Sequence, residues 1–198
     1  LEMKKIFLEI IVCNGIENDA LKILKNKKNL RIIDSSSLNK INLNLISSNI
    51  NSYLLQTSDN FSFLKSNFKV VSKIKPSYKT LKNLLFAFNI CRFVKSNAIV
   101  LANKDTTIGI GSGQSSRLDS CEIAIKKMKK FYKEKEDDEI IAASDAFFPF
   151  VDGIEKLIQS GVSAIIQPSG SIRDKEIIKF ANRTNTILVF SKTRHFRH

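Results

Sequence analysis

Ile-Ile-Ala-Ala-Ser-Asp-Ala-Phe-Phe-Pro-Phe, residues 140–150, is the stretch from which the rest of the chain can be interpreted. Its apolar start is typical of a buried strand, and a strong helix start follows its last phenylalanine. The loop between them carries Asp145 and three phenylalanines. Either these rings fill the core of a domain, or together with Asp145 they line a binding site.

The sequence around this stretch predicts strands that alternate with helices, which is an α/β fold. Two helix starts have the spacing of a capping box, Asp152 with Glu155 and Ser171 with Asp174. Apolar runs that predict strands lie at residues 98–102, 106–110, 140–143, 162–166 and 186–190.

The beginning of the chain predicts a smaller unit of the same kind. Residues 6–12 have the character of a buried strand, a short helix follows from about Glu17, and residues 29–33 form a second strand. Strand, helix and strand in this order predict a right-handed parallel crossover.

A boundary is predicted near Pro76, where Ser77 is placed to cap a helix. The segment before it, residues 35–67, is rich in serine and asparagine and predicts little regular structure. We therefore expect two parts, residues 1–75 and residues 76–198.

The net charge of +13 and the pI near 9.7 raise the alternative of a basic RNA-binding domain. The lysines are spread along the whole chain rather than gathered on one predicted element, and the run Lys126–Lys130 is typical of a solvated helix face. We expect no nucleic-acid partner. A positive field also suits a small anionic substrate.

Three cysteines, Cys13, Cys91 and Cys121, lie far apart and form no C-x-x-C motif. They are typical of buried, reduced thiols, which predicts a cytoplasmic protein. No apolar run approaches the about 18 residues that a membrane span needs, so we expect no membrane contact.

A glycine-rich segment follows the strand predicted at residues 106–110. Gly109, Gly111 and Gly113 lie between this strand and a helix, where glycine permits the backbone to approach an anion closely. Their spacing is not that of a dinucleotide fingerprint, and no phosphate-loop lysine follows. As a nucleotide signature this segment is weak.

Unusual side chains follow three of the predicted strands at the point where each strand ends. They lie at Asp145–Phe150, at Ser169–Ser171 and at Arg194–His198, and the last segment holds both histidines of the chain. Because the carboxyl ends of parallel strands meet at one edge of a sheet, we expect the three segments to line one cleft. For the last segment, a disordered basic tail is the alternative.

These segments resemble the C-terminal part of the bifunctional purine biosynthesis family, its formyltransferase domain. The resemblance covers most of residues 76–198 and extends more loosely over residues 1–34. The segments that carry it are Val94–Val100, Ile108–Arg117, Ser144–Phe150, Ile166–Ser171 and Arg194–His198.

The resemblance implies a three-layer α/β domain of cytidine deaminase-like topology, with a remnant of a first lobe at residues 1–75 and a complete second lobe at residues 76–198. It implies formyl transfer from 10-formyltetrahydrofolate to 5-aminoimidazole-4-carboxamide ribonucleotide in purine (IMP) biosynthesis, at a site that two subunits of a homodimer share. No zinc is expected, because the sequence has neither an H-x-E nor a P-C-x-x-C motif.

By the same resemblance, five residues bind the ribonucleotide. Asn97 and Arg117 hold its carboxamide end, Phe147 lines the pocket for its ring, and Phe196 is a further substrate-binding residue. Arg194 reaches the phosphate, a task that suits the forked guanidinium group.

The remaining roles concern catalysis and the second substrate. The aromatic amine is a weak nucleophile, so a group must accept its proton; His198 is placed near it, with Asn97 as the other catalytic residue. Asp152 and Ser171 lie on the folate side, and Asp145 supports a site for a monovalent cation, potassium.

The sequence departs from the family in ways that matter for activity. The Lys-His pair of the family's site falls upstream of residue 1, and these 198 residues contain no Lys-His dipeptide. We therefore expect little or no turnover from the chain alone. A catalytically inactive ligand-binding or dimerisation module is the alternative to an active enzyme.

Overall fold

The computed structural model describes residues 1–38, 44–61, 67–133 and 138–198. The chain divides into two compact units, Leu1–Ser58 and Asp59–His198. The boundary therefore falls before the predicted position at residue 75. The reason is strand β5 (Phe68–Val70), which pairs with the last strand of the second unit.

The first unit contains the predicted crossover. Strand β1 (Ile10–Cys13) and strand β2 (Arg31–Asp34) run parallel, from the pair Ile10–Arg31 to the pair Cys13–Asp34. Helix α2 (Asn18–Leu24) connects them, and a short helix α1 (Glu2–Lys5) precedes them. The prediction of a parallel strand-helix-strand unit is confirmed.

A β-hairpin follows within the first unit, in a region where the sequence predicted little. Strands β3 (Leu45–Asn49) and β4 (Ser52–Gln56) pair in antiparallel register. The segment between Lys40 and Asp59 carries no charged residue. A two-stranded hairpin without a covering layer is marginally stable at best.

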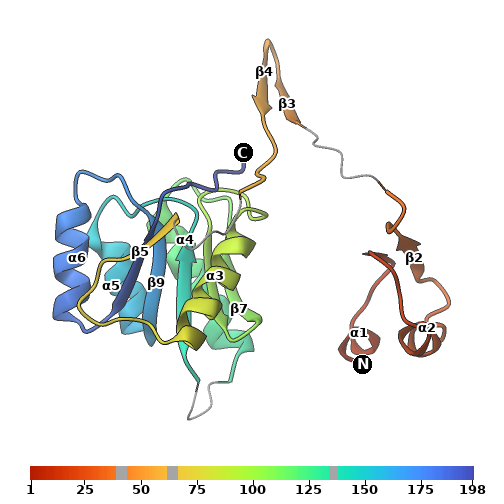
Figure 1. The fold of residues 1–198 in the computed structure, drawn as a ribbon. Helices are drawn as coiled ribbons and strands as arrows, with labels where there is room; N and C mark the ends of the chain where they lie inside the picture. The colour runs from red at the N-terminus through yellow and green to blue at the C-terminus, as the bar shows by residue number, and fades with distance from the viewer. Residues whose placement is uncertain (39–43, 62–66, 134–137) are drawn as a thin grey trace. The chain divides into compact units, whose positions relative to one another are not determined.

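The second unit is a mixed sheet with helices on both faces (Figure 1). Its strands are ordered β5-β10-β9-β8-β6-β7. They are β6 (Ile99–Asn103), β7 (Thr106–Gly111), β8 (Ile140–Ser144), β9 (Val162–Pro168) and β10 (Ile187–Ser191), in addition to β5.

Only part of this sheet is parallel. β8, β9 and β10 run parallel to one another, whereas β6 pairs antiparallel with both β7 and β8, and β5 pairs antiparallel with β10. The carboxyl ends of β8, β9 and β10 therefore lie at one edge, as predicted.

The helices bury two separate apolar clusters against the sheet. Helix α3 (Tyr78–Cys91) packs on one face, where Leu84 and Phe88 are fully buried. Three helices cover the other face, where the larger cluster lies: α4 (Arg117–Phe131), α5 (Val151–Gln159) and α6 (Asp174–Arg183). The second unit thus has three layers, with the sheet between two layers of helices.

The capping predictions have mixed outcomes. Ser77 caps α3, accepting a hydrogen bond from the backbone N–H of Thr80 at 3.0 Å. The N-cap residue of α5 is Phe150 and not Asp152, and that of α6 is Arg173 and not Ser171. The helices begin one residue before Asp152 and three after Ser171, so the capping-box spacing was read in the wrong register.

The glycines of β7 have a structural task that the sequence did not indicate. A Cβ atom at Gly111 would lie 1.8 Å from the carbonyl oxygen of Ser120, and one at Gly109 would lie 2.2 Å from that of Ala124. Both carbonyls belong to α4. The two glycines therefore let α4 pack directly on β7, which explains them without an anion.

Among the described residues, no helix combines the length and the apolar character that a membrane crossing requires. All three cysteines are free thiols; Cys91 and Cys121 are buried and Cys13 is half-buried.

Replacing Gly111 with alanine is expected to destabilise the second unit by about 3 kcal/mol, because the new methyl group collides with helix backbone that cannot move aside. The free energy of unfolding in urea measures the loss. The same exchange at Gly113 is the control: a Cβ there has no neighbour closer than 3.8 Å, but φ is +69°, so the cost is about 1 kcal/mol. Equal losses at both positions would contradict the packing explanation.

The thiols provide a second test of the fold. Burial raises the pKa of the Cys121 thiol to about 12, with only Arg117 opposing the rise, and burial also raises the pKa of Cys91, to which nearby Asp145 adds. Neither residue forms the reactive thiolate near pH 8. Titration of the native protein with a disulfide reagent should therefore label Cys13 alone, and the variant Cys13→Ser should react only in denaturant.

Candidate functional site

The three segments that were expected to line one cleft do lie together at the carboxyl ends of β8, β9 and β10. The backbone N–H of His195 donates to the carbonyl oxygen of Asp145 at 2.8 Å, and the N–H of Ser169 donates to the carbonyl oxygen of Ser191 at 2.9 Å. The terminal segment is thus tied to the phenylalanine-rich loop and is no free tail.

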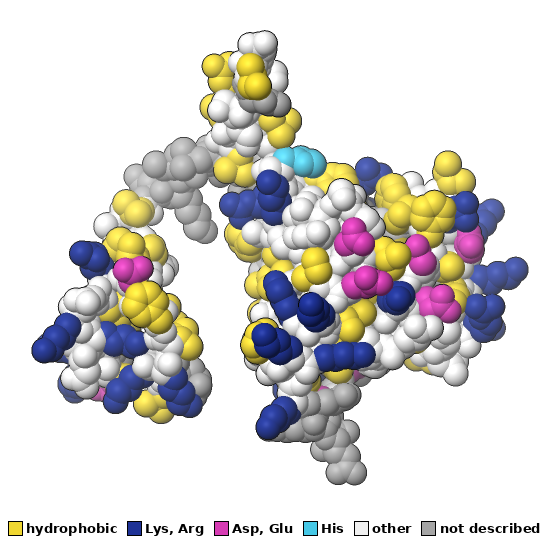
Figure 2. Space-filling model, turned by 180° about the vertical axis from the view of Figure 1, so that it is seen from behind, with side chains coloured by type: hydrophobic (Ala, Val, Ile, Leu, Met, Phe, Trp, Pro, Cys, Tyr) yellow, Lys and Arg dark blue, Asp and Glu magenta, His cyan; other side chains and the backbone are white. Residues whose placement is uncertain are grey.

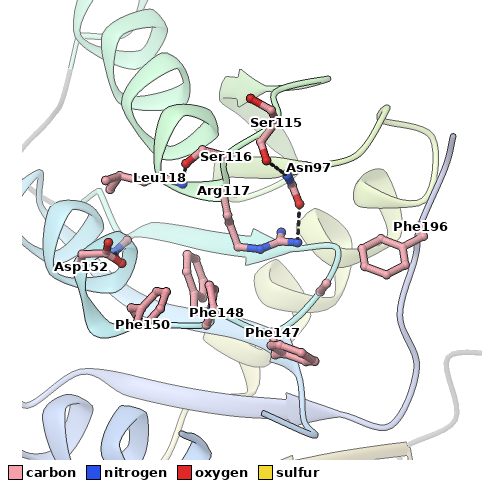
Figure 3. A pocket seen from close by; sticks show the side chains of 13 residues that line it. Asn97, Ser115, Ser116, Arg117, Leu118, Phe147, Phe148, Phe150, Asp152 and Phe196 are labelled. Atoms are coloured by element: carbon pink, nitrogen blue, oxygen red, sulfur yellow. Dashed lines mark hydrogen bonds between the residues drawn. The ribbon is translucent and has the colours of Figure 1, made fainter. Parts of the chain in front are cut away.

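A cavity of about 420 Å³ opens at this edge. Figure 3 shows the guanidinium group of Arg117 reaching towards Asn97, the phenylalanines of the loop, and Phe196 of the terminal segment. The residues that line the cavity are Asn97, Ser115, Ser116, Arg117, Leu118, Ala146, Phe147, Phe148, Pro149, Phe150, Asp152, Gly153 and Phe196.

Packing against helix α5 fixes the position of the phenylalanine-rich loop. Phe148 is buried, and its ring carbons would be 2.7 Å from a Cβ atom at Gly153, in the first turn of α5. The ring therefore occupies the space that the missing side chain leaves. The interpretation as core filling is confirmed for Phe148, which belongs to the core cluster. Phe147, Phe148 and Phe150 also line the cavity, so a binding role for the loop stays a prediction.

Arg117 is the polar centre of the site. Its side chain is 8% exposed and makes three hydrogen bonds. Nη1 donates to Asp145 Oδ1 at 2.5 Å and to Ser144 Oγ at 2.8 Å, and Nη2 donates to Asn97 Oδ1 at 2.8 Å. A buried charge is tolerated only when it is paired and hydrogen-bonded, and Arg117 meets both conditions.

Asp145 is fully buried beside this arginine. Its second carboxylate oxygen, Oδ2, accepts a hydrogen bond from Ser96 Oγ at 2.5 Å. Both oxygens therefore have protein partners, and Arg117 neutralises the charge. Among the described residues, no group of three or more histidine, cysteine, aspartate or glutamate side chains is arranged to hold a metal ion.

Asn97 links this pair to the glycine-rich segment. Its amide nitrogen donates to the carbonyl oxygens of Gln114 and Ser115, at 2.9 and 3.2 Å, while its amide oxygen accepts a hydrogen bond from Arg117 Nη2. Its backbone carbonyl accepts from Ser120 Oγ at 2.8 Å. The side chain is held in one orientation at the cavity wall, as Figure 3 shows.

The predicted residues outside this centre differ in how close they lie to the cavity. The guanidinium carbon of Arg194 lies 4.7 Å from the centre of the Phe147 ring, a cation–π contact that leaves this exposed arginine at the cavity rim. The exposed His198 has its ring 5.7 Å from that of Phe196. Neither is among the residues that line the cavity.

The two residues expected on the folate side are separated. Asp152 lines the cavity, and its Oδ1 accepts from the backbone N–H of Gly153 at 2.7 Å. Ser171 lies in the loop after β9, where its Oγ accepts from the backbone N–H of Arg173 at 3.1 Å. Ser171 does not line the cavity, although Gly170 beside it approaches Arg194.

Sequence reasoning missed the other histidine. His195 is 1% exposed, and its Nδ1 lies 2.5 Å from Asp59 Oδ2. It also missed Ser96 and Ser144, the hydroxyl partners of the ion pair. Aspartate and histidine 136 positions apart leave no local pattern, so their pairing is evident only once the chain is folded.

Removing either member of the buried pair should be costly. Asp145→Ala leaves the buried charge of Arg117 without its partner, and Arg117→Met does the same to Asp145. For each variant we expect a loss of about 3–5 kcal/mol in unfolding free energy. The double variant should lose less than the sum of the two, which urea unfolding measures as a coupling.

Glu122→Ala is the matched control, because it breaks the exposed pair between Lys156 and Glu122, at 3.2 Å, and should change stability by less than about 1 kcal/mol. Additive losses at Arg117 and Asp145 would show that their contact is not the source of the stability.

Comparison with known proteins now gives the family. A family model described as AICARFT/IMPCHase bienzyme matches residues 1–127. The chain is 44% identical over 197 residues to the bifunctional purine biosynthesis protein PurH of Caldicellulosiruptor bescii. It is 42% identical to PurH of Lactobacillus acidophilus and 43% identical to PurH of Buchnera aphidicola.

These matches cover 99–100% of the chain but only 37–38% of each relative. The chain thus spans a little over a third of the length of these relatives. With a family model across more than half of the sequence, the chain belongs to the AICARFT/IMPCHase bienzyme family.

Proposed function

We propose that this chain forms part of the family's formyltransferase site. The reaction is transfer of a formyl group from 10-formyltetrahydrofolate to the amine of 5-aminoimidazole-4-carboxamide ribonucleotide, in purine biosynthesis. One observation carries the proposal: Asn97, Arg117, Phe147 and Phe196, from four separate segments, line one cavity. The relatives' name, which refers to purine biosynthesis, supports it.

The cavity suits a flat aromatic ligand with an anionic end. Its volume of about 420 Å³ is within the usual range for small-molecule sites, and four phenylalanines are among the residues that line it. Arg194 stands at the rim with its guanidinium group stacked on Phe147. In the proposed complex this group binds the phosphate, and Phe147 with Phe196 contacts the imidazole ring.

The polar end of the cavity receives the carboxamide in this proposal. Arg117 and Asn97 already bond to each other there, so a ligand meets donors and acceptors that are held in place. Preorganised groups of this kind lower the cost of binding because they need not be ordered when the ligand arrives.

The chemistry needs a proton acceptor near the amine. As the amine attacks the formyl carbon it loses a proton, and a tetrahedral intermediate forms whose oxygen carries the negative charge. When the intermediate collapses, the bond between the formyl carbon and the folate nitrogen breaks, and this nitrogen takes up a proton as tetrahydrofolate leaves. His198 is proposed to accept the proton; its ring centre lies 5.7 Å from that of Phe196, which lines the cavity. An imidazole is suited to this exchange near neutral pH.

The second substrate enters from the side of α5 and α6 in this proposal. Asp152 contacts the folate in the cavity, and Ser171 contacts it from the neighbouring loop. The cytidine deaminase-like topology and a homodimer with shared sites belong to the same proposal. Asp145 already bonds to Arg117 and Ser96, so no step is assigned to a potassium ion there.

The distribution of charge favours a small ligand over RNA. On the face of the second unit that Figure 2 shows, lysine and arginine side chains lie at several separate places, with hydrophobic and acidic side chains between them. A nucleic-acid interface usually gathers its basic residues into one stripe or patch.

Calorimetric titration of the chain with the ribonucleotide tests the proposal. We expect binding, and we expect Phe147→Ala or Arg194→Gln to weaken it at least about tenfold, because each removes an aromatic or charge-assisted contact. Arg183→Gln is the matched control: its guanidinium also stacks on a phenylalanine, Phe180 at 5.0 Å, away from the cavity, so affinity should not change.

A turnover assay with both substrates completes the test. Because the chain has no Lys-His dipeptide, we expect binding with little formyl transfer by these 198 residues alone. Binding that is insensitive to Phe147 and Arg194 would contradict the site. No binding of the ribonucleotide, together with salt-sensitive affinity for RNA, would favour the nucleic-acid alternative.

A further inference from the structure

We propose that Asp59 and His195 act as positioning residues, which hold the terminal segment so that Arg194 and Phe196 reach the cavity. The part of this inference that concerns ligand binding rests on the proposed function. The part that concerns the terminal segment rests on its contacts alone.

His195 is the buried member of an otherwise exposed segment. Its side chain is fully enclosed, while Arg194, Phe196, Arg197 and His198 are exposed. Its ring centre lies 4.4 Å from that of Phe88 in α3 and 5.4 Å from that of Phe61. The imidazole therefore docks the end of the chain on the apolar cluster beneath α3.

The contact with Asp59 fixes the orientation of the His195 ring. His195 Nδ1 lies 2.5 Å from Asp59 Oδ2, and because a carboxylate only accepts hydrogen bonds, Nδ1–H is the donor. The Asp59 side chain is 29% exposed and the imidazole is buried, so solvent screens the bond only partly. Apolar packing alone would leave the ring free to turn; the hydrogen bond fixes its plane.

The backbone on each side of His195 is then fixed as well. The N–H of His195 donates to Asp145, and two residues later Arg197 and Ser96 exchange hydrogen bonds, at 3.0 and 3.2 Å. On either side of the buried His195, Arg194 and Phe196 are exposed. With His195 held inward, its neighbours Arg194 and Phe196 are presented to the cavity, as their contacts with Phe147 and the cavity wall show.

Asp59, which makes this hydrogen bond to His195, lies at the other end of the second unit. It is the first residue of the second unit, directly after the segment that leads from hairpin β4. The next residues are held nearby: the ring of Phe61 packs edge-on against Phe68 of β5 at 6.2 Å. The start and the end of this unit thus meet at one hydrogen bond beside the candidate site.

Two variants separate this hydrogen bond from simple packing. Asp59→Ala removes the acceptor without touching the terminal segment, and His195→Phe keeps an aromatic ring against Phe88 but removes Nδ1. Each should raise the rate at which carboxypeptidase Y releases Phe196, followed by mass spectrometry, about tenfold, as expected for losing a hydrogen bond to a charged group. Each should also weaken binding of the ribonucleotide by a similar factor.

Asp59→Asn is the conservative variant, which keeps an acceptor oxygen and should restore most of the protection and of the affinity. Asp105→Ala removes an exposed carboxylate that pairs with Lys82 at 3.5 Å, far from the site, and should change neither measurement. The double variant Asp59→Ala with His195→Phe should be no worse than either single variant, because both remove the same contact.

The outcomes separate this inference from the proposed function. If the unaltered chain does not bind the ribonucleotide, the proposed function fails, and release of Phe196 still decides whether Asp59 holds the terminal segment. Unchanged release in Asp59→Ala and in His195→Phe would overturn the inference. Faster release with unchanged affinity would also overturn it, because the segment would then be anchored without positioning the site.

Discussion

The buried ion pair between Arg117 and Asp145 is the interaction on which the candidate site depends. It joins the first residue of α4 to the loop after β8, and it extends through Asn97 and Ser96 to the segment before β6. Three parts of the second unit thus converge on two charges. Because an unpaired charge at this depth would be expensive, the pair requires the loops around it to adopt one arrangement.

This arrangement explains why the cavity has one polar end and one aromatic side. The guanidinium group faces the carboxamide of Asn97. The phenylalanines of the loop follow Asp145 in the sequence, and Figure 3 shows Phe147 and Phe148 on the side of the cavity away from Asn97. A ligand with a polar substituent on a flat ring meets both. The positive charge at the rim comes from another segment, through Arg194. In the proposed complex, different parts of the chain would therefore contact the ring and the anion.

Periodicity and turn residues were sufficient to predict the order of the elements in the second unit and the edge where the site lies. They succeeded because β8, β9 and β10 are nearly continuous apolar runs, and each ends in residues of unusual type. They failed at helix starts, where Asp152 and Ser171 have cap-like spacing but bond to other backbone groups. They also failed for β5, whose three residues are paired by a strand over a hundred positions away.

The site residues show the same division between local and distant information. Asn97, Arg117, Phe147 and Phe196 were identified through family-like strings, and the cavity brings them together. His195 and Asp59 were not, because their partnership exists only once the sheet has formed. Gly109 and Gly111 were considered as part of a weak nucleotide signature, whereas their neighbours in space are helix carbonyls.

The contact between Gly153 and Phe148 ties the geometry of the cavity floor to the composition of a helix. A methyl group at residue 153 would have to displace the Phe148 ring, which is buried and cannot swing into solvent. We therefore expect Gly153 and Phe148 to tolerate substitution only together, with a larger residue at 153 compensated by a smaller one at 148. Such a swap would keep the volume beneath the cavity about the same, while the helix rather than the loop would supply the apolar surface there.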